Sequence, residues 1–119
     1  METTYNHKLV IGSGFSGIYI RCSYKKLLEK LGDDFQLSQL KEGKKLDECS
    51  DDKIRHEWIL TSGPNGDQVI TIYDYKEDRK ILRDTIINWH VGCKGLTSET
   101  VRKVLTVDYE FTDEELDFE

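Results

Sequence analysis

Long apolar runs and proline are nearly absent from this sequence. Its 119 residues contain one proline, and no apolar run approaches the roughly 20 residues that a membrane-spanning helix needs. Residues 1–8 are polar and lack the apolar segment of a secretory signal. The length is typical of one domain, and we expect the protein to act inside the cell that makes it.

Cysteine is scarce, and its spacing is uninformative. Cys22, Cys49 and Cys93 form an odd set without Cys-x-x-Cys spacing. This pattern fits reduced thiols better than a disulfide framework. A zinc site that combines the three thiols with His90 would lack the close ligand pairs of structural zinc sites. We therefore predict no metal and no cofactor.

An excess of basic residues is also missing. The net charge is −6, and seven of the 23 acidic residues lie in residues 107–119, which contain no Lys or Arg. The rest of the chain carries 16 acidic and 17 basic residues and is nearly neutral. Because a nucleic-acid-binding surface needs a basic patch, we do not expect direct binding of nucleic acid.

The first half of the chain predicts a strand followed by a helix. Residues 17–22 are rich in β-branched and aromatic residues, as strands are. Ser23 is a predicted N-cap and Gly32 a predicted stop. Between them, apolar residues recur with helical spacing at Tyr24, Leu27, Leu28 and Leu31. Residues 33–52 predict a long loop with a helical turn near Phe35–Leu40.

The second half predicts three strands and a final helix. The strands cover 53–61, 69–76 and 85–92, with turn chemistry at 62–68 between the first two. The helix begins near Thr97, with Leu96 and Val101 spaced as a hydrophobic staple. We therefore predict an α+β fold in the order β-α-β-β-β-α. Its antiparallel sheet would have about four strands with two short helices on one face, and residues 108–119 would form an acidic tail on a domain of residues 1–107.

The segment GSGFSG at residues 12–17 fits the spacing G-x-G-x-x-G. In dinucleotide-binding folds a helix begins at these glycines and directs its N–H groups at the pyrophosphate. Here the glycines lead into Ile18-Tyr19-Ile20, which predicts a strand. The segment is therefore interpreted as a loop that enters the first strand.

Four segments carry a family resemblance: GSGFSGIYIRCSYKKLLEKLG (12–32), HEWIL (56–60), ITIYDYK (70–76) and NWHVGCKG (88–95). In order and spacing they resemble a group of small uncharacterised proteins from tailed phages and large DNA viruses, with Cys93 in place of a glycine of the last motif. The resemblance covers about residues 12–95. It implies a viral origin and a role in the host cytoplasm, and it supplies no established activity.

Side-chain alternation places the candidate binding residues on one face of the sheet. Aliphatic residues of the three later strands would face the helices, and the opposite face would gather Glu57, Tyr73, Tyr75, Asn88 and His90, with Lys76 nearby. Aromatic rings beside a few polar groups suit a flat ligand. The alternative is that these rings are cross-strand pairs that stabilise the sheet.

The function expected from these features is binding rather than catalysis. We predict a non-enzymatic viral protein that counters a host defence, either by sequestering a small signalling nucleotide or by inhibiting a host protein. In the first case Tyr73 and Tyr75 stack on a base, Lys76 holds a phosphate, His90 hydrogen-bonds, and Ser13 and Ser16 with their loop amides bind phosphate. We also expect a homo-oligomer, which would place such a pocket between subunits. The alternative is a small hydrolase or phosphodiesterase that uses His90, or His56, with Glu57.

The acidic tail has two interpretations. Its charge is typical of a solvated, disordered end. As a docking element it would bind a basic partner surface through aromatic residues set among carboxylates, namely Tyr109, Phe111, Leu116 and Phe118 with Glu114 and Glu115. The same charges would suit a mimic of nucleic acid, but the body of the chain is nearly neutral.

Overall fold

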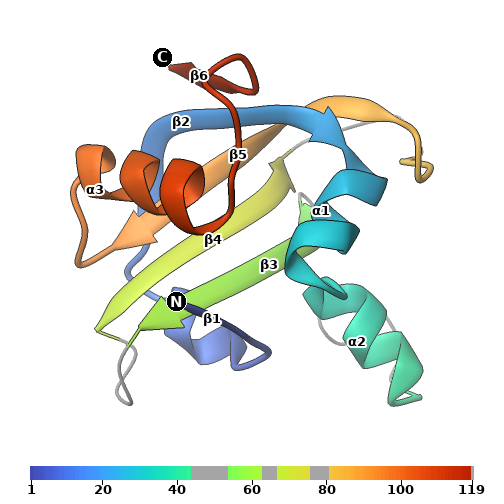
Figure 1. Cartoon of the computed structure of the whole chain (residues 1–119). Coiled ribbons are helices and arrows are strands. Elements are labelled where there is room, and N and C mark those ends of the chain that lie inside the picture. Colours follow the sequence, from blue (N-terminus) through green and yellow to red (C-terminus); the bar gives the residue numbers. More distant parts are fainter. Residues whose placement is uncertain (44–53, 63–66, 76–80, 119) are drawn as a thin grey trace.

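The computed structural model describes residues 1–43, 54–62, 67–75 and 81–118. It is an α+β fold built on one antiparallel sheet, as predicted (Figure 1). The sheet has six strands in the order β1-β3-β4-β5-β2-β6, so the prediction of about four strands is wrong. The strands are β1 (Glu2–Thr4), β2 (Gly14–Ser23), β3 (Ile54–Ser62), β4 (Gln68–Tyr75), β5 (Ile86–Lys94) and β6 (Leu116–Phe118).

The two strands that the sequence did not predict are three-residue edge strands. β1 pairs with β3, with Glu2 opposite Thr61, and β6 pairs with β2, with Ile18 opposite Phe118. β1 comes from a polar segment, whereas β6 alternates Leu116, Asp117 and Phe118. A segment of three residues is nevertheless too short for alternation to distinguish a strand from a loop. Short edge strands limit unwanted pairing between molecules.

The first predicted helix is confirmed as α1 (Tyr24–Leu31), and both of its predicted ends are correct. The Ser23 hydroxyl accepts a hydrogen bond from the Lys26 amide and caps the helix. Gly32 ends it with φ 84°, a left-handed conformation that glycine adopts without strain. The buried side chains of α1 are Tyr24, Leu27 and Leu31, three of the four apolar positions predicted.

The remaining helical segments are short. α2 (Phe35–Lys41) is a helix where the sequence predicted only a turn; Asp34 caps it by accepting from the Leu37 amide at 3.0 Å. α3 (Ser98–Lys103) begins after its N-cap Thr97, as predicted, and continues into the π-helix η3 (Val104–Asp108). A 3-10 helix, η1 (His7–Val10), follows β1.

The apolar core lies between the sheet and the segments α1, α3 and η3 (Figure 1). At its centre, Trp58 of β3 and Trp89 of β5 meet edge to face with ring centroids 5.4 Å apart. Both indole N–H groups donate to carbonyls, Trp58 to Gly32 and Trp89 to Cys22. Each buried ring therefore keeps its polar atom satisfied.

A polar network adjoins this core at the start of α2. Asp34 is fully buried and accepts from the Tyr24 hydroxyl, and its carboxylate lies 3.4 Å from Nδ1 of His56. The His56 amide donates in turn to buried Asp74 at 2.7 Å. The network ties α1, α2, β3 and β4 together, and it lies on the helix-covered side of the sheet.

Residues 108–118 of the acidic tail, hereafter the acidic segment, pack on the domain. Phe111 is 2% exposed and belongs to the core. Glu115 pairs with Lys26 of α1, and its carbonyl accepts from the Arg21 amide. Lys30 donates to the Tyr109 carbonyl at 2.8 Å. A backbone amide of β2 and two lysines of α1 thus hold this segment on the domain.

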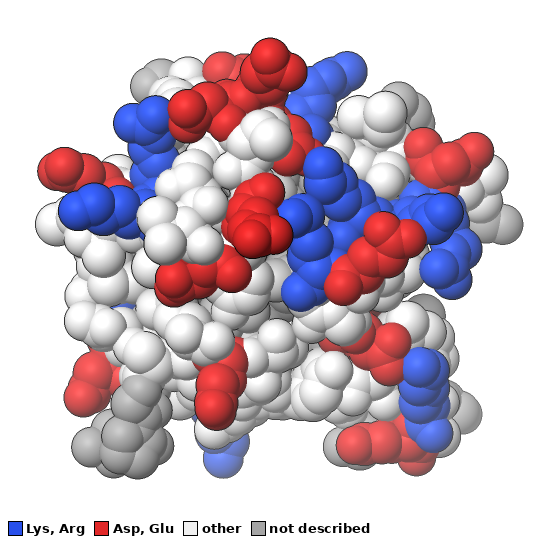
Figure 2. Space-filling model, viewed as in Figure 1, with Lys and Arg blue, Asp and Glu red and all other residues white. Residues whose placement is uncertain are grey.

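The helix-bearing face is mixed in charge. Figure 2 shows Lys and Arg side chains interspersed with Asp and Glu over this face. Within the described residues, the structure contains no helix with the length and apolar composition needed to cross a bilayer. The predicted turn at 62–68 lies partly outside the described residues, but the antiparallel pairing of β3 with β4 confirms the hairpin.

Removing the Phe111 ring tests how far the acidic segment contributes to stability. We expect Phe111→Ala to lower the free energy of unfolding by about 3–5 kcal/mol, the usual cost of emptying a buried phenylalanine site. Phe118→Ala, which truncates a half-exposed ring of the same segment, should cost less than about 1 kcal/mol. Urea denaturation measures both. Equal losses for the two variants would mean that the segment does not pack as described.

Candidate functional site

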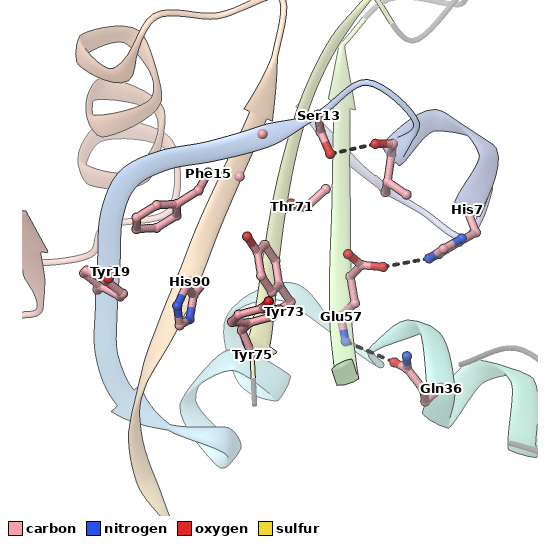
Figure 3. Close-up of a pocket in the computed structure, with 13 residues that line it drawn as sticks. His7, Ser13, Phe15, Tyr19, Gln36, Glu57, Thr71, Tyr73, Tyr75 and His90 are labelled. Carbon is pink, nitrogen blue, oxygen red and sulfur yellow. Dashed lines mark hydrogen bonds and ion pairs between the residues drawn. The ribbon is translucent and has the colours of Figure 1, made fainter. Parts of the chain in front are cut away.

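A cavity of about 570 Å³ opens on the face of the sheet opposite α1 and α3 (Figure 3). Its volume lies within the roughly 300–1,000 Å³ of small-molecule sites. The sheet forms its floor, and η1, the loop before β2 and α2 form its walls. It is lined by His7, Val10, Ser13, Gly14, Phe15, Tyr19, Gln36, Glu57, Thr71, Tyr73, Tyr75, His90 and Gly92.

The floor is built from one row of side chains that crosses four strands. In the register of the sheet, Glu57 of β3 lies opposite Tyr73 of β4, Tyr73 opposite His90 of β5, and His90 opposite Tyr19 of β2. Side chains directly opposite one another project from the same face about 5 Å apart. The row therefore places a carboxylate at one end and aromatic rings along the rest.

His90 lies at the centre of an aromatic cluster, formed by His90 with Phe15, Tyr19, Tyr73 and Tyr75. The Tyr73 ring stacks on the imidazole at 5.5 Å with planes 23° apart. Tyr19 and Tyr75 meet it edge to face at 4.9 and 5.5 Å, and Phe15 is tilted at 5.3 Å. Phe15 and Tyr75 are each 39% exposed, so their rings remain accessible at the cavity rim.

Gly92 gives the cavity its depth. A Cβ atom there would lie 2.7 Å from Oγ1 of Thr71 and 3.4 Å from Cε1 of Tyr73. Any side chain would therefore displace Thr71 or fill the floor beside Tyr73. The β-bulge between Phe15 and Ile18 lies opposite this point in β2, and bulges commonly redirect side chains near functional sites.

Glu57 forms the polar wall of the cavity. The residue is 4% exposed, and its Oε1 lies 3.0 Å from Nε2 of His7. Its backbone amide donates to Oε1 of Gln36 at 3.0 Å, which fixes β3 against α2. The His7 ring packs on Phe35 of α2 with centroids 5.0 Å apart. His7 of η1 thus holds the carboxylate of Glu57, and Gln36 of α2 holds its backbone (Figure 3).

The charges of the cavity favour neutral or cationic groups. The lining residues include Glu57 but neither Lys nor Arg within the part of the chain described. The pKa of Tyr73 is raised above its usual value, first by burial and then by the charge of Glu57 and by Tyr75 and Tyr19. The Tyr73 hydroxyl therefore stays protonated and can donate a hydrogen bond.

The structure brings most of the predicted ligand-binding residues together. Glu57, Tyr73, Tyr75, His90 and Ser13 all line the cavity. The Ser13 hydroxyl donates to the Val10 carbonyl at 2.6 Å and so holds the loop that closes one wall. Lys76 lies outside the described residues.

Ser16 and Asn88, two further polar residues singled out in the sequence, do not line the cavity and are hydrogen-bonded elsewhere. The Ser16 hydroxyl donates to the Val91 carbonyl and accepts from the Ile18 amide, which stabilises the bulge in β2. Asn88 lies on the same face as His90 but accepts from Arg21 at 3.2 Å. Phosphate binding by Ser16 would therefore require its present hydrogen bonds to change.

The predicted docking residues of the acidic segment are engaged by the domain to different degrees. The Tyr109 hydroxyl donates to the Met1 carbonyl, and the Phe111 ring is buried in the core. Glu115 pairs with Lys26, whereas Glu114 is exposed. A partner that binds this segment as it is folded would contact Glu114 but not the ring of Phe111.

The two members of the catalytic pair considered from the sequence come from strands that are not neighbours. Glu57 and His90 lie in the same row, but Tyr73 of the intervening strand separates them. His56, the alternative base, lies on the opposite side of the sheet beside Asp34.

Among the described residues, no three His, Cys, Asp or Glu side chains lie close enough to hold a metal ion. Burial raises the pKa of the Cys22 thiol to about 12, so it remains protonated.

Several lining residues were not found by sequence reasoning. Tyr19 and Phe15 reach the cavity because β2 pairs with β5, and that pairing has no signature in the sequence. His7 and Gln36 come from short helical segments without a sustained period, so nothing indicated where they point. Tyr19 alone had a usable signal, since it alternates with Ile18 and Ile20.

Comparison of the chain with protein-family models, with curated proteins and with solved structures finds no significant match. Family membership therefore contributes nothing to the assignment of this cavity. The chemistry of its lining has to carry any functional conclusion.

The electrostatic coupling between Glu57 and Tyr73 can be measured in solution. We expect Glu57→Gln to lower the pKa of Tyr73, because the substitution removes a negative charge that opposes ionisation of the phenol. A ¹³C NMR titration of the tyrosine Cζ resonances reports each phenol separately. Tyr109 is the internal control, because its raised pKa comes from burial and Asp108 and should not change. An unchanged Tyr73 pKa would place Glu57 outside the cavity.

Proposed function

We propose that the protein is a non-enzymatic binding protein whose cavity holds a planar heteroaromatic group, the base of a small nucleotide. The observation that carries this proposal is the stacked Tyr73–His90 pair, which lies on the floor of an open cavity between the rings of Phe15, Tyr19 and Tyr75. A flat ligand can stack on such rings whatever its substituents, and each stacked base is stabilised by about 1–3 kcal/mol.

The rigidity of the site supports binding. Tyr19, Tyr73 and His90 belong to neighbouring strands with continuous pairing, and their neighbours in sequence, among them Ile20, Ile72 and Trp89, are fully buried on the other face. The rings are therefore ordered before a ligand arrives. Preorganised side chains lose little conformational entropy on binding, which favours affinity.

Glu57 and His90 lie two strands apart in the row on the cavity floor, with Tyr73 between them, so both border the space that a base would fill. The base would occupy the cavity, and its sugar and phosphate would extend through the open mouth toward solvent. Lys76, which directly follows β4, is the predicted phosphate partner.

The biological setting of the proposal rests on the resemblance to proteins of tailed phages and large DNA viruses. In that setting, sequestration of a signalling nucleotide in the host cytoplasm would counter a host defence. A homo-oligomer would add a wall from a second subunit to the exposed rim at Phe15 and Tyr75.

Removal of one rim ring tests the proposal. We expect Tyr75→Ala to weaken binding of the best ligand in a panel of adenosine, guanosine, cytidine and uridine by about 5- to 150-fold, the equivalent of one lost stacking contact. Phe118→Ala removes a ring of similar exposure whose neighbour is Arg102 of α3 and is the matched control. Isothermal titration calorimetry gives the dissociation constants.

Two results would contradict the proposal. One is that no nucleoside or its monophosphate shifts the NMR resonances of Tyr19, Tyr73 or His90. The other is that Tyr75→Ala and Phe118→Ala weaken binding equally, since a ligand held by the cavity contacts only the first of these rings.

A further inference from the structure

A buried carboxylate, that of Glu57, lies at one end of the row that forms the cavity floor. Glu57 is 4% exposed and directly faces the cavity beside Tyr73 (Figure 3). A charged group taken out of water is destabilising unless hydrogen bonds compensate for the lost solvation. Glu57 is paired with His7, and it is also part of the cavity lining beside the aromatic rings, which is the placement expected of a recognition group.

The surroundings of Glu57 hold it in one orientation. His7 lies 3.0 Å from Oε1, on the side of the carboxylate away from the aromatic cluster (Figure 3). Gln36 accepts from the Glu57 amide and fixes the backbone. His7 is therefore a positioning residue, and the carboxylate is presented to the space above Tyr73.

The distances fit a ligand that stacks and hydrogen-bonds at once. Adjacent strands lie about 4.8 Å apart, and Glu57 is on the strand next to Tyr73. A base stacked on the rings of Tyr73 or Tyr75 would therefore bring one edge to the carboxylate. The described lining contains Glu57 but no Lys or Arg, and His7 is hydrogen-bonded to the Glu57 carboxylate.

The chemistry of an ionised carboxylate selects the edge that it binds. It only accepts hydrogen bonds, and it binds best to two parallel N–H donors. Among the common nucleobases, guanine presents two adjacent donors, N1–H and the N2 amino group. Adenine and cytosine set their amino group beside a ring acceptor, which a carboxylate repels, and uracil sets its N–H between two carbonyls.

We infer that Glu57 selects a guanine-type base, whose paired N–H donors it accepts while the ring stacks on the aromatic cluster. The inference rests on the proposed function, because it assigns the ligand class of the same cavity. His7 supports the selection by holding the carboxylate, and the phosphates of the ligand lie outside the negative field of Glu57.

Comparison of guanosine with inosine tests the inference directly. Inosine keeps N1–H and the ring but lacks the N2 amino group, so it loses one hydrogen bond to a charged acceptor. We expect the wild-type protein to bind guanosine about 10- to 100-fold more tightly than inosine, as measured by isothermal titration calorimetry with adenosine as a third ligand.

Substitution of Glu57 should remove this preference. In Glu57→Gln the ratio of the guanosine and inosine affinities should fall close to one, while adenosine binding changes little. Glu99→Gln removes the same charge from exposed α3 and should keep the wild-type ratio. His7→Ala leaves the carboxylate in the chain but removes the group that positions it, so it should lower the guanosine-to-inosine ratio below the wild-type value without abolishing it. It serves as a second variant if Glu57→Gln does not fold, as checked by tryptophan fluorescence.

The outcomes separate this inference from the proposed function. Equal affinity of the wild-type protein for guanosine and inosine, or an unchanged ratio in folded Glu57→Gln, would overturn the selection of guanine. In either case binding that still depends on Tyr75 would leave the proposed function standing. If none of the three nucleosides binds, the proposed function fails first.

Discussion

The pairing of β5 with β2 on one side and β4 on the other determines which residues enter the core and which line the cavity. Because side chains alternate across a strand, this register directs Trp89 into the core and His90 to the opposite face. A slip by one residue would exchange the two faces along the whole strand. The buried indole, with its N–H donated to the Cys22 carbonyl, therefore fixes the position of the imidazole on the other side.

One face of the sheet carries the apolar core, and the other carries the cavity. One is sealed by α1, α3 and the acidic segment, with Phe111 closing the core. The other is left partly uncovered, and only η1, α2 and the loop before β2 border it. The stable face supplies the rigidity that the open face needs, since rings used for recognition must be held before the ligand arrives.

The strands and the helix whose apolar residues recur with a clear period could be predicted from the sequence. Alternation in β3, β4 and β5 was enough to place Glu57, Tyr73, Tyr75 and His90 on one face. Capping chemistry located α1 at both ends. The edge strands β1 and β6 were missed because three residues carry no period. His7, Phe15 and Gln36 were missed because their positions depend on tertiary packing. The packing of the acidic segment on Lys26 and Lys30 was also missed, because the rest of the chain is nearly neutral and shows no basic surface in its sequence.

Whether the cavity over His90 holds a planar heteroaromatic ligand can be measured by native mass spectrometry. The protein is purified rapidly from cells that produce it and then denatured, and the released molecules are identified. We expect a mass excess equal to one small nucleotide-like molecule per cavity, which is absent from Tyr75→Ala prepared in the same way. A wild-type protein that carries no small molecule, or one that carries a polypeptide in its place, would contradict the proposed function.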